Sequence, residues 1–520
     1  MTADGEALSG VRLAELVASL SLATDLGLGQ PQGHVLRQTV IAARLAEAAG
    51  LTEEQQASVY YASLLAWVGC VSDSHELAKW FGNDLWMRDE SYRLDKAGLP
   101  LMRFMIGHLG AGSSPMHRLT MVGRFIAGGS REVASTMLSH CQAASLIAAG
   151  LGLDEVSGVL AQSFERWDGR GVPGSRAGDQ IDPVMRVVQV ADDAEVLARS
   201  GGIESAIDEL RARRGTEFDP ALVDLVCARP DQILDEVDES AAWDEVIGAV
   251  AGLDRELTEA ELSTVLLAVA DFADLKCPSW TGHSRGVARL AADAAGRLGL
   301  PPADRVLVER AGLVHDLGAL GVSTGIWDKQ GPLNESERER VRTHPYLTER
   351  VLTRCAPLRS IGAIAALHHE RLDGSGYPRG VGADAIPMTA RILAVADVAH
   401  ALAEDRPHRG ASGERERTDV LRAEVRAGRL DGEAVNAVLA ATGQRVRRRA
   451  ELPAGLSARE VEVLQLLVLG RSNKQIAEAL NITTRTAGSH IEHIYTKIGV
   501  TTRGAAAYYA MRNGLVREPV

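Results

Sequence analysis

One long sequence pattern occurs twice in this chain of 520 residues, and the repeat constrains the fold more than any other feature. The segment GHVLRQTVIAARLAEAAGL at 33–51 resembles GHSRGVARLAADAAGRLGL at 282–300, and the segment that starts at Phe164 resembles the one that starts at His369. Self-similarity over such lengths means that one structural unit is present in two copies. At roughly 100–200 residues per domain the length predicts three to five domains, so two copies leave room for a further module.

The spacings between corresponding positions agree between the copies even where the residues differ. An interval of 32 residues separates His34 from Ala66 in the first copy and His283 from His315 in the second. An interval of 29 residues likewise separates Ser163 from Asp192 and His368 from Asp397. The offset between the copies is 249 in the front half but 204 at the pair His140 and His344, and 205 thereafter. The first copy therefore carries an insertion of 45 residues between about 70 and 135, which we expect to cap it.

Apolar residues recur at three- and four-residue steps in long stretches, for example at 40–51 and 287–300, whereas strand-like alternation is scarce. We therefore predict an all-α chain with two tandem helical domains and a small C-terminal module. The predicted boundaries are 1–240 for the first copy, 256–443 for the second, 444–453 for a basic linker and 454–520 for the module.

Composition excludes several classes of protein. The five cysteines are scattered without a CxxC pair, which disfavours both a disulfide framework and a zinc ribbon. The N-terminus is acidic rather than basic, and the longest mostly apolar run, at 59–71, is too short to span a bilayer. We therefore expect a cytoplasmic protein with no membrane partner.

The second copy contains seven potential metal ligands. They are His283, the adjacent His315 and Asp316, His344, the adjacent His368 and His369, and Asp397. Imidazoles mixed with carboxylates suit iron, manganese or zinc, whereas a cage of oxygens would suit magnesium or calcium. If Asp316 bridges two cations about 3.5–4 Å apart, the pair can activate a shared water and stabilise charge on a phosphoryl oxygen. The alternative is a set of isolated polar histidines, which the two dipeptides and their order disfavour.

These residues lie in motifs that resemble the HD-GYP domain, a helical metal-dependent phosphohydrolase of the HD superfamily. The motifs are HDLGALG at 315–321, HPYLTERVL at 344–352, HHERLDGSGYPRG at 368–380 and ARILAVADVAHAL at 390–402, in a match over roughly 271–440. The resemblance implies a cluster of two, sometimes three, metals, usually iron or manganese, and hydrolysis of cyclic di-GMP to pGpG or GMP.

The same resemblance assigns roles to further residues. Gly376, Tyr377 and Pro378 correspond to the signature loop beside the nucleotide, and the predicted substrate-binding set also includes Arg371 and Asp373. Such domains often carry a lysine just ahead of the first ligand histidine, where this chain has Lys276. The predicted catalytic residues are therefore Asp316 and Lys276.

Four positions depart from the family pattern. Ala319 stands where the HDxGK motif has its lysine, and His400 replaces the second acid of DxxDAL. Loss of the lysine removes a contact to phosphate worth about 1–2 kcal/mol, which leaves open whether turnover survives. Cys277 stands where an aspartate commonly follows the lysine, and Ser279 stands where three-metal members can supply a glutamate. We therefore expect two metals rather than three.

The first copy has lost most of the ligand pattern. Ala66 and Trp67 replace the HD pair, and Ser163 and Phe164 replace the HH pair. The remaining residues at ligand positions are His34, His140 and Asp192. Three scattered ligands do not build a two-metal cluster, so this copy is expected to dimerise, to pack against the other copy, or to bind a ligand without cleaving it.

Charge is distributed unevenly along the chain. The formal net charge is −13, but residues 444–520 hold 12 Lys or Arg against 6 Glu, a net of +6, which leaves −19 for residues 1–443. Ser457 with Glu460 and Ser472 with Gln475 have capping-box spacing, and Thr483 or Thr484 can cap a third helix. The apolar face of that helix is predicted to contain Ala487, Ile491, Ile494 and Ile498.

Residues 456–516 resemble the LuxR-type helix-turn-helix domain, which implies four helices, the third of which presents a polar face to the DNA major groove. By that resemblance the phosphate-contacting candidates are Lys474, Lys497 and Arg503, and the base-reading candidates are Arg485, Ser489 and His493. The alternative is a solvated helical tail, which the caps and the periodicity disfavour.

Two classes of function follow from the sequence. The first is a homodimeric transcription regulator whose second copy binds and hydrolyses a cyclic dinucleotide and so alters DNA binding. The second is a sensor that keeps metal and nucleotide without turnover, because Ala319 and His400 replace family residues. An HD phosphohydrolase of another nucleotide is a third possibility.

Overall fold

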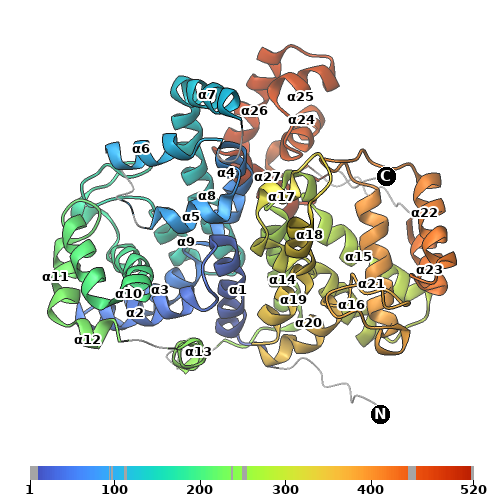
Figure 1. Cartoon of the computed structure of the whole chain (residues 1–520), viewed down its shortest axis with the longest axis horizontal. Helices are drawn as coiled ribbons and strands as arrows, with labels where there is room; N and C mark the ends of the chain where they lie inside the picture. The colour runs from blue at the N-terminus through green and yellow to red at the C-terminus, as the bar shows by residue number, and fades with distance from the viewer. Residues whose placement is uncertain are drawn as a thin grey trace. The chain divides into compact units, whose positions relative to one another are not determined.

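In the computed structural model the regular elements are helices throughout, as Figure 1 shows. The structure describes residues 10–92, 94, 98–110, 114–235, 238–248, 255–442 and 452–516, and these contain isolated bridge pairs but no strand. The predicted all-α class is confirmed. Within the same residues, no helix combines the length and the apolar character needed to cross a bilayer.

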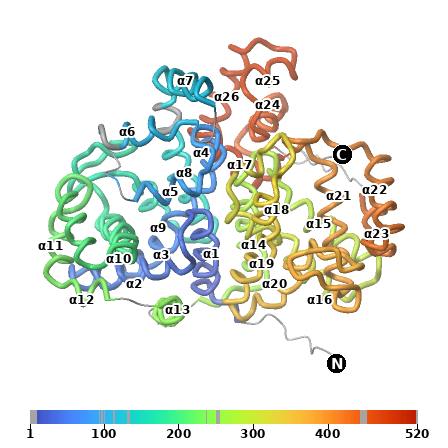
Figure 2. The backbone as a smooth tube through the Cα atoms, in the orientation of Figure 1, coloured from blue at the N-terminus to red at the C-terminus, as the bar shows by residue number. Residues whose placement is uncertain are grey.

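The chain divides into two compact units. One comprises Arg12–Glu256 with Ser323–Gly325, and the other comprises Met1–Val11, Leu257–Val322 and Ile326–Val520. The first copy thus lies in one unit, and the second copy shares the other with the C-terminal helices, which are red in Figure 2. The predicted linker at 444–453 lies outside the described residues except for its last two positions.

The first copy and its insertion form a long series of helices. Their bounds are α1 (Leu13–Leu28), α2 (His34–Ala48), α3 (Glu53–Leu65), η1 (Val68–Asp73), α4 (Ser74–Phe81), α5 (Asp84–Ser91), α6 (Gly98–His108), α7 (Pro115–Arg124), η2 (Phe125–Gly129), α8 (Ser130–Gly150), α9 (Asp154–Leu160), η3 (Gly178–Gln180), α10 (Pro183–Arg213), α11 (Pro220–Ala228), α12 (Pro230–Ile233) and α13 (Glu239–Gly248).

The second copy and the C-terminal module follow. Their bounds are α14 (Glu259–Asp274), η4 (Pro278–Trp280), α15 (His283–Arg297), α16 (Pro302–Val314), η5 (Leu317–Gly321), α17 (Thr324–Trp327), α18 (Glu335–Arg342), α19 (His344–Leu352), η6 (Ala356–Leu358), α20 (Arg359–Ala365), η7 (Ala383–Ala385), α21 (Met388–Leu402), α22 (Glu414–Arg426), α23 (Gly432–Thr442), η8 (Pro453–Gly455), α24 (Ala458–Val468), α25 (Asn473–Leu480), α26 (Thr484–Ile498) and α27 (Arg503–Arg512).

The repeat is visible in the local geometry. Helices α2 and α15 both have 15 residues, and each follows a glycine with positive φ, 85° at Gly33 and 83° at Gly282. A buried aspartate accepts hydrogen bonds from the first backbone N–H groups of each helix, Asp25 in the first copy and Asp274 in the second. The same cap therefore positions His283, the first predicted ligand of the second copy, and His34, its counterpart in the first.

A close backbone contact is repeated as well. A Cβ atom on Gly69 would lie 2.1 Å from the carbonyl oxygen of His140, and a Cβ atom on Gly318 would lie 2.1 Å from that of His344. These glycines follow the HD position of each copy, so only a residue without a side chain lets that segment approach the next ligand helix.

The insertion of the first copy has a small apolar core of its own. Its buried members are Trp80, Phe81, Met87, Met105, Leu109, Met121 and Phe125, which come from α4 to α7 and η2. Arg88 of α5 is buried and bonds to Asp73 and to the carbonyl oxygen of Gly27, which ties the insertion to the first copy. The insertion is thus packed rather than a loose loop.

The C-terminal helices have the predicted caps. Ser457 and Ser472 form capping boxes with Glu460 and Gln475, and Thr483 caps α26. On α26 the predicted apolar face is inward, with three of its members buried and Ile498 half-buried.

We expect Gly69→Ala to destabilise the protein, because the new methyl group must displace the backbone at His140. Overpacking of this kind costs about 1–3 kcal/mol, which in a unit of this size lowers the thermal midpoint by about 2–4 °C per kcal/mol. Thermal unfolding followed by circular dichroism measures it. Gly158→Ala is the control, since no atom lies within 4 Å of its Cβ position, and equal midpoints for the two variants would contradict the contact.

Candidate metal centre and nucleic-acid interface

Five helices and the turns beside them bring all seven predicted ligands of the second copy into one buried cluster. His283 and His344 are the first residues of α15 and α19, His315 and Asp316 follow α16, His368 and His369 follow α20, and Asp397 lies within α21. The donor atoms of the triads His344, His368 and His369, and His283, His315 and Asp397, each lie within 4.8 Å of one another. Residues 114 positions apart therefore meet at one point.

Backbone carbonyl groups fix the orientation of three imidazoles. The Nδ1 atoms of His315, His344 and His368 lie 2.8, 2.6 and 2.7 Å from the carbonyl oxygens of Gly312, Val341 and Ala365, each three residues earlier. Nδ1 must donate in these bonds, because a carbonyl oxygen only accepts. The lone pair of each ring is therefore on Nε2, which points to the interior of the cluster.

The two oxygens of Asp316 face different groups of histidines. Oδ1 lies 3.3 Å from Nε2 of His344 and 3.4 Å from Nε2 of His368. Oδ2 lies 3.5 Å from Nε2 of His315 and 3.8 Å from Nε2 of His283. Asp397 lies on the second side, 3.4 Å from His283, and its other oxygen is 3.9 Å from His369. One carboxylate therefore separates two sets of donors, as a bridging ligand would.

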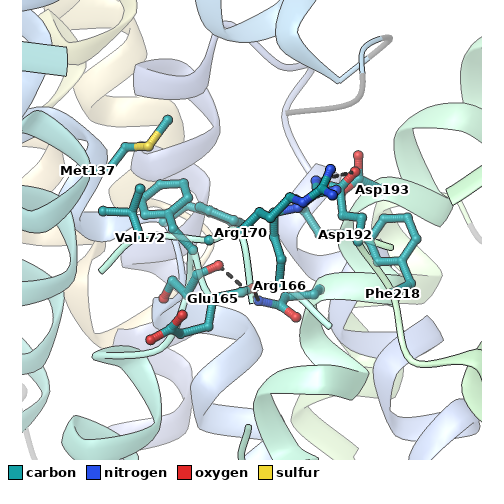
Figure 3. A pocket seen from close by; sticks show the side chains of 14 residues that line it. Met137, Glu165, Arg166, Arg170, Val172, Asp192, Asp193 and Phe218 are labelled. Atoms are coloured by element: carbon teal, nitrogen blue, oxygen red, sulfur yellow. Dashed lines mark hydrogen bonds and ion pairs between the residues drawn. The ribbon is translucent and has the colours of Figure 1, made fainter. Parts of the chain in front are cut away.

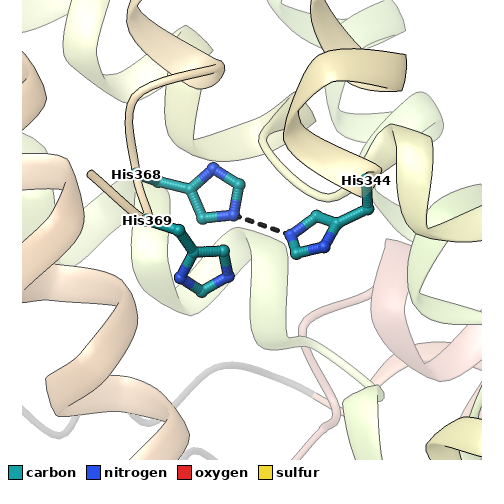
Figure 4. A group of neighbouring side chains, drawn as sticks. All are labelled: His344, His368 and His369. Carbon is teal, nitrogen blue, oxygen red and sulfur yellow. Dashed lines mark hydrogen bonds between the residues drawn. The ribbon is translucent and has the colours of Figure 1, made fainter. Parts of the chain in front are cut away.

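The donor set fits divalent cations. Nε2 of His344 and Nε2 of His368 lie 3.0 Å apart, although both carry lone pairs. Figure 4 marks this contact with a dashed line. Nε2 of His315 is buried without a hydrogen-bond partner. Two donors bound to one ion at about 2.1 Å lie about 3.0–3.4 Å apart. The distances among His344, His368 and Oδ1 of Asp316 fall in that range. A cation between these atoms would convert the repulsion of the lone pairs into coordination.

The ionisation of part of the cluster also suits a metal. His283 differs, because burial would lower its pKa but Glu404 and Asp397 raise it well above its usual range. Burial alone raises the pKa of Asp316, but the surrounding histidines hold it well below its usual range. Burial lowers the pKa of His315 to about 4, and burial together with His368 and His344 lowers the pKa of His369. Ionised carboxylates and neutral imidazoles are the protonation states that bind metal.

A second group of polar residues supports the first ligand. Nδ1 of His283 lies 3.1 Å from Glu404, which also accepts from His400 at 3.0 Å. Arg406 donates to the other oxygen of Glu404 at 2.5 Å. The carboxylate of Glu404 thus orients His283, a role that sequence reasoning did not find because Glu404 lies outside every quoted motif.

The signature loop lies at the edge of the cluster. The ring of Tyr377 stacks on His369 with centroids 4.7 Å apart, and the Arg342 guanidinium lies 5.9 Å from the Tyr377 ring centre. Arg371 donates to the carbonyl oxygen of His368, and Asp373 accepts from Ser375. Arg371 and Asp373 are therefore hydrogen-bonded within the loop, whereas Tyr377 and Arg342 form a stacked surface beside the ligands.

The turns that hold Gly376 and Pro378 are held by Glu370, a buried residue. Its carboxylate accepts from the backbone N–H groups of Arg379 and Val381 at 2.8 and 3.1 Å. A Cβ atom on Gly376 would lie 2.4 Å from the backbone nitrogen of Arg371, so the loop needs glycine there.

The environment of Ala319 is apolar. Ala319 packs with Cys277 and Trp280, and Trp327 lies against the same group. Lys276, predicted as catalytic, is completely buried beside Cys277. The position where the family has a lysine is therefore part of a small core.

In the first copy, side chains balance the buried carboxylates of Asp192 and Glu195. Nε2 of His34 lies 3.2 Å from Asp192 and its Nδ1 lies 2.6 Å from Glu195. Burial would lower the pKa of His34, but these carboxylates raise it to about 10. Tyr92 from the insertion also donates to Asp192 at 3.3 Å. The partners of Asp192 are therefore an imidazolium and a phenol.

The other remaining histidine of the first copy has a different orientation. Nε2 of His140 donates to the carbonyl oxygen of Ala66 at 2.8 Å, and burial lowers its pKa to about 3. Its ring centre lies 4.8 Å from that of Phe164 and 5.6 Å from that of Trp67. Nε2, the nitrogen that faces the interior of the cluster in His344, is therefore engaged in His140 by a hydrogen bond to the backbone.

A narrow pocket remains next to the altered positions of the first copy (Figure 3). Its volume is about 60 Å³, and its charged lining residues are of both signs, including Arg166, Arg170, Asp192 and Asp193. Two of the residues that replace ligands, Ser163 and Phe164, also line it.

The candidate base-reading residues lie on one exposed face of α26. Arg485, Ser489 and His493 are exposed, while Ala487 and Ile494 on the opposite side are buried. Lys474 is exposed on α25. Lys497 and Arg503 are engaged within the unit, because Lys497 bonds to Glu460 at 2.7 Å and Arg503 donates to the carbonyl oxygen of Arg471.

The C-terminal helices touch the second copy next to its first ligand. Thr281 donates to the carbonyl oxygen of Val468, and a Cβ atom on Gly282 would lie 3.1 Å from Val516. Arg471 pairs with Asp405 at 3.0 Å, and Tyr508 of α27 is buried where α27 packs on α14. These contacts adjoin His283 and Glu404 in the chain, while the reading face of α26 remains exposed.

Two known families match this chain. The family described as "HD domain" matches residues 71–222 and 268–434, and the family described as "Bacterial regulatory proteins, luxR family" matches residues 454–510. The HD match therefore falls on both copies, beginning at residue 71 in the first, and the LuxR match falls on the helices that carry the candidate DNA-binding residues.

Curated relatives match either most of this chain or a shorter part of it. The chain is 31% identical over 404 residues to "3'3'-cGAMP-specific phosphodiesterase 3" of Vibrio cholerae, covering 77% of this chain and 88% of that protein. It is 35% identical over 161 residues to "Cyclic di-GMP phosphodiesterase response regulator RpfG" of Xanthomonas campestris pv. campestris, covering 30% of this chain and 42% of that relative's length. A crystal structure of a V. cholerae cyclic GMP-AMP phosphodiesterase matches with a TM-score of 0.58 and 27% identity, covering 84% of this chain and 99% of the other.

We expect the purified protein, loaded anaerobically with Fe(II) or Mn(II) and desalted, to retain two metals per chain. His368→Ala should retain at most one, because its imidazole belongs to one side of Asp316. Elemental analysis measures the content. Ser163→Ala, at the same position of the first copy, is the control and should retain two. Equal metal content in His368→Ala and the unaltered protein would show that the cluster is not the binding site.

Proposed function

The chain belongs to the HD domain family, and from this we propose that its second copy binds and hydrolyses a cyclic dinucleotide and thereby controls the C-terminal DNA-binding module. The relatives support the reaction class, and the LuxR-family match supports the DNA-binding role. Because its target is DNA, we place the regulator in the cytoplasm.

The observation that carries the proposal is the position of Asp316. Its two oxygens face separate sets of histidines, so it is placed to bridge two ions. We assign His344, His368 and His369 to one ion and His283, His315 and Asp397 to the other. Arg406 already supplies a positive charge to Glu404, which favours two ions over three in this chain.

Two bound divalent ions, iron or manganese by the family resemblance, would supply Lewis-acid polarisation of a phosphodiester and a water of lowered pKa. The residues around the site hold the ligand side chains in place. The backbone bonds of His315, His344 and His368 fix the ligand geometry before substrate arrives. Burial of the cluster strengthens every electrostatic interaction with a phosphoryl group, because little water is present to screen it.

The stacked surface beside the ligands suits a nucleotide. Tyr377 is half-buried at the edge of the cluster, where its ring is proposed to stack on a base, and the exposed Arg342 next to it is proposed to contact a phosphate. Arg371 and Asp373 hold the loop rather than the substrate in this assignment, because their polar atoms bond within it. Lys276 is fully buried, so we assign it a positioning role rather than a catalytic one.

The substrate is proposed to be 3'3'-cGAMP, with cyclic di-GMP as the alternative. The similarity to the Vibrio phosphodiesterase covers 77% of this chain, whereas that to the Xanthomonas cyclic di-GMP phosphodiesterase covers 30%. A non-catalytic sensor is the second candidate function, and the apolar environment of Ala319 favours it because a phosphate-binding charge is missing there.

Coupling to DNA is proposed to run through the contact between Pro278–Gly282 and the C-terminal helices. This turn leads directly into His283, so a change in the ligand cluster is transmitted to the residues that touch Val468 and Val516. Readers of this type bind paired half-sites, which favours a homodimer on DNA. The exposed residues Arg485, Ser489 and His493 are proposed to approach base edges.

We expect the Mn(II)- or Fe(II)-loaded protein to convert 3'3'-cGAMP or cyclic di-GMP to a linear dinucleotide. Asp316→Ala should lower the rate at least about 100-fold, because both ions lose a ligand. Asp384→Ala removes a carboxylate from an exposed turn of the same copy and should leave the rate unchanged. Chromatography of the products measures the rate. Tight nucleotide binding without turnover would establish the sensor instead, and neither binding nor turnover would refute the nucleotide assignment.

We expect Arg485→Ala to weaken binding to DNA selected from a random-sequence pool by about 1–3 kcal/mol, because the residue would contact a base. Arg415→Ala, which removes the same charge from α22, should not change the affinity. Fluorescence anisotropy at several salt concentrations measures both. A protein truncated after residue 443 should not bind, and unchanged binding by that truncation would place the DNA site elsewhere.

A further inference from the structure

The first copy contains a mostly apolar cavity that the proposed activity does not use. Its volume is about 130 Å³, and it lies between the altered ligand positions and the insertion. The lining residues that matter here are Trp67, Phe164, Leu77, Met87, Leu101 and Met105. Polar groups are scarce on its walls.

The substitutions that removed the metal ligands form one wall. By the offsets of the repeat, Trp67 stands at the position of Asp316 and Phe164 at that of His369. Two polar ligands of the second copy have thus become large apolar side chains in the first. The opposite wall comes from the insertion, which the second copy lacks, through Met87 and Met105.

One buried polar atom on these walls has no partner. Nε1 of Trp67 makes no hydrogen bond, although only 7% of the residue is exposed. A buried donor left without an acceptor is costly, and most native structures pair such groups. Trp67 also lines the narrow pocket of Figure 3, as do Met137 and Phe164, so its ring lies between the two spaces.

The charged groups on the walls are already paired. Arg88 bonds to Asp73 and to the carbonyl oxygens of Gly27 and Cys70, and Tyr92 donates to Asp192. A charged ligand would therefore find no free counter-ion on the charged side chains described. The chemistry of the walls selects a neutral molecule.

We propose that the first copy binds a small neutral molecule, about one ring in size, that places a hydrogen-bond acceptor at Nε1 of Trp67. An apolar cavity of about 150 Å³ is known to hold one benzene molecule, which sets the size of the ligand. Loss of the metal site and gain of the insertion have made this cavity. The inference does not depend on the activity of the second copy.

Acetophenone and ethylbenzene test the proposal, because they have the same shape and only the ketone carries an acceptor. Titration calorimetry of the full chain is expected to show one acetophenone per chain, bound roughly 3- to 10-fold more tightly than ethylbenzene. Trp67→Phe keeps an aromatic ring but removes the donor, so it should erase the preference for acetophenone while retaining weak binding of both.

Leu77→Trp tests the location independently, since a larger side chain on this wall should fill the cavity and abolish binding of both molecules. Circular dichroism shows whether each variant is folded. Absence of binding to the unaltered protein would overturn the proposal. It would also be overturned if Trp67→Phe kept the full preference, or if the folded Leu77→Trp variant bound both probes unchanged.

Discussion

Three hydrogen bonds from imidazole Nδ1 atoms to backbone carbonyl oxygens hold the ligand cluster of the second copy in place. They fix the rings of His315, His344 and His368, so their lone pairs converge on Asp316. The lone pairs of neutral imidazoles and the oxygens of carboxylates repel one another at such short distances unless a positive charge lies among them. The rest of this copy, from the caps of its helices to the glycine at 318, keeps these residues close.

The first copy has the same helical scaffold, but its buried carboxylate charge is balanced in a different way. Its aspartate at 192 faces the imidazolium of His34 and the phenol of Tyr92, so its buried charge is balanced by side chains. His140 donates to the backbone instead of pointing inward. Trp67 and Phe164 then fill the space with apolar surface. One fold therefore supports either a cation site or an apolar cavity, depending on a few positions.

The sequence allowed prediction of the helical class, the repeat and the seven ligands that the structure brings together, because periodicity and matched intervals record which residues share a turn of the fold. The caps at Ser457, Ser472 and Thr483 were predictable because they are local. Glu404 and Tyr92 could not be found this way. Their roles depend on tertiary contacts, and no local pattern marks a carboxylate that will orient a histidine 121 residues away.

We infer that the second copy alone holds a pair of metal ions bridged by Asp316. Crystals of the full chain grown with Mn(II) and measured for anomalous scattering test it most directly, because they locate ions independently of activity. Two peaks about 3.5–4 Å apart are expected on either side of Asp316, and none between His34 and His140. A single peak, no peak in the second copy, or a peak at the first copy would contradict it.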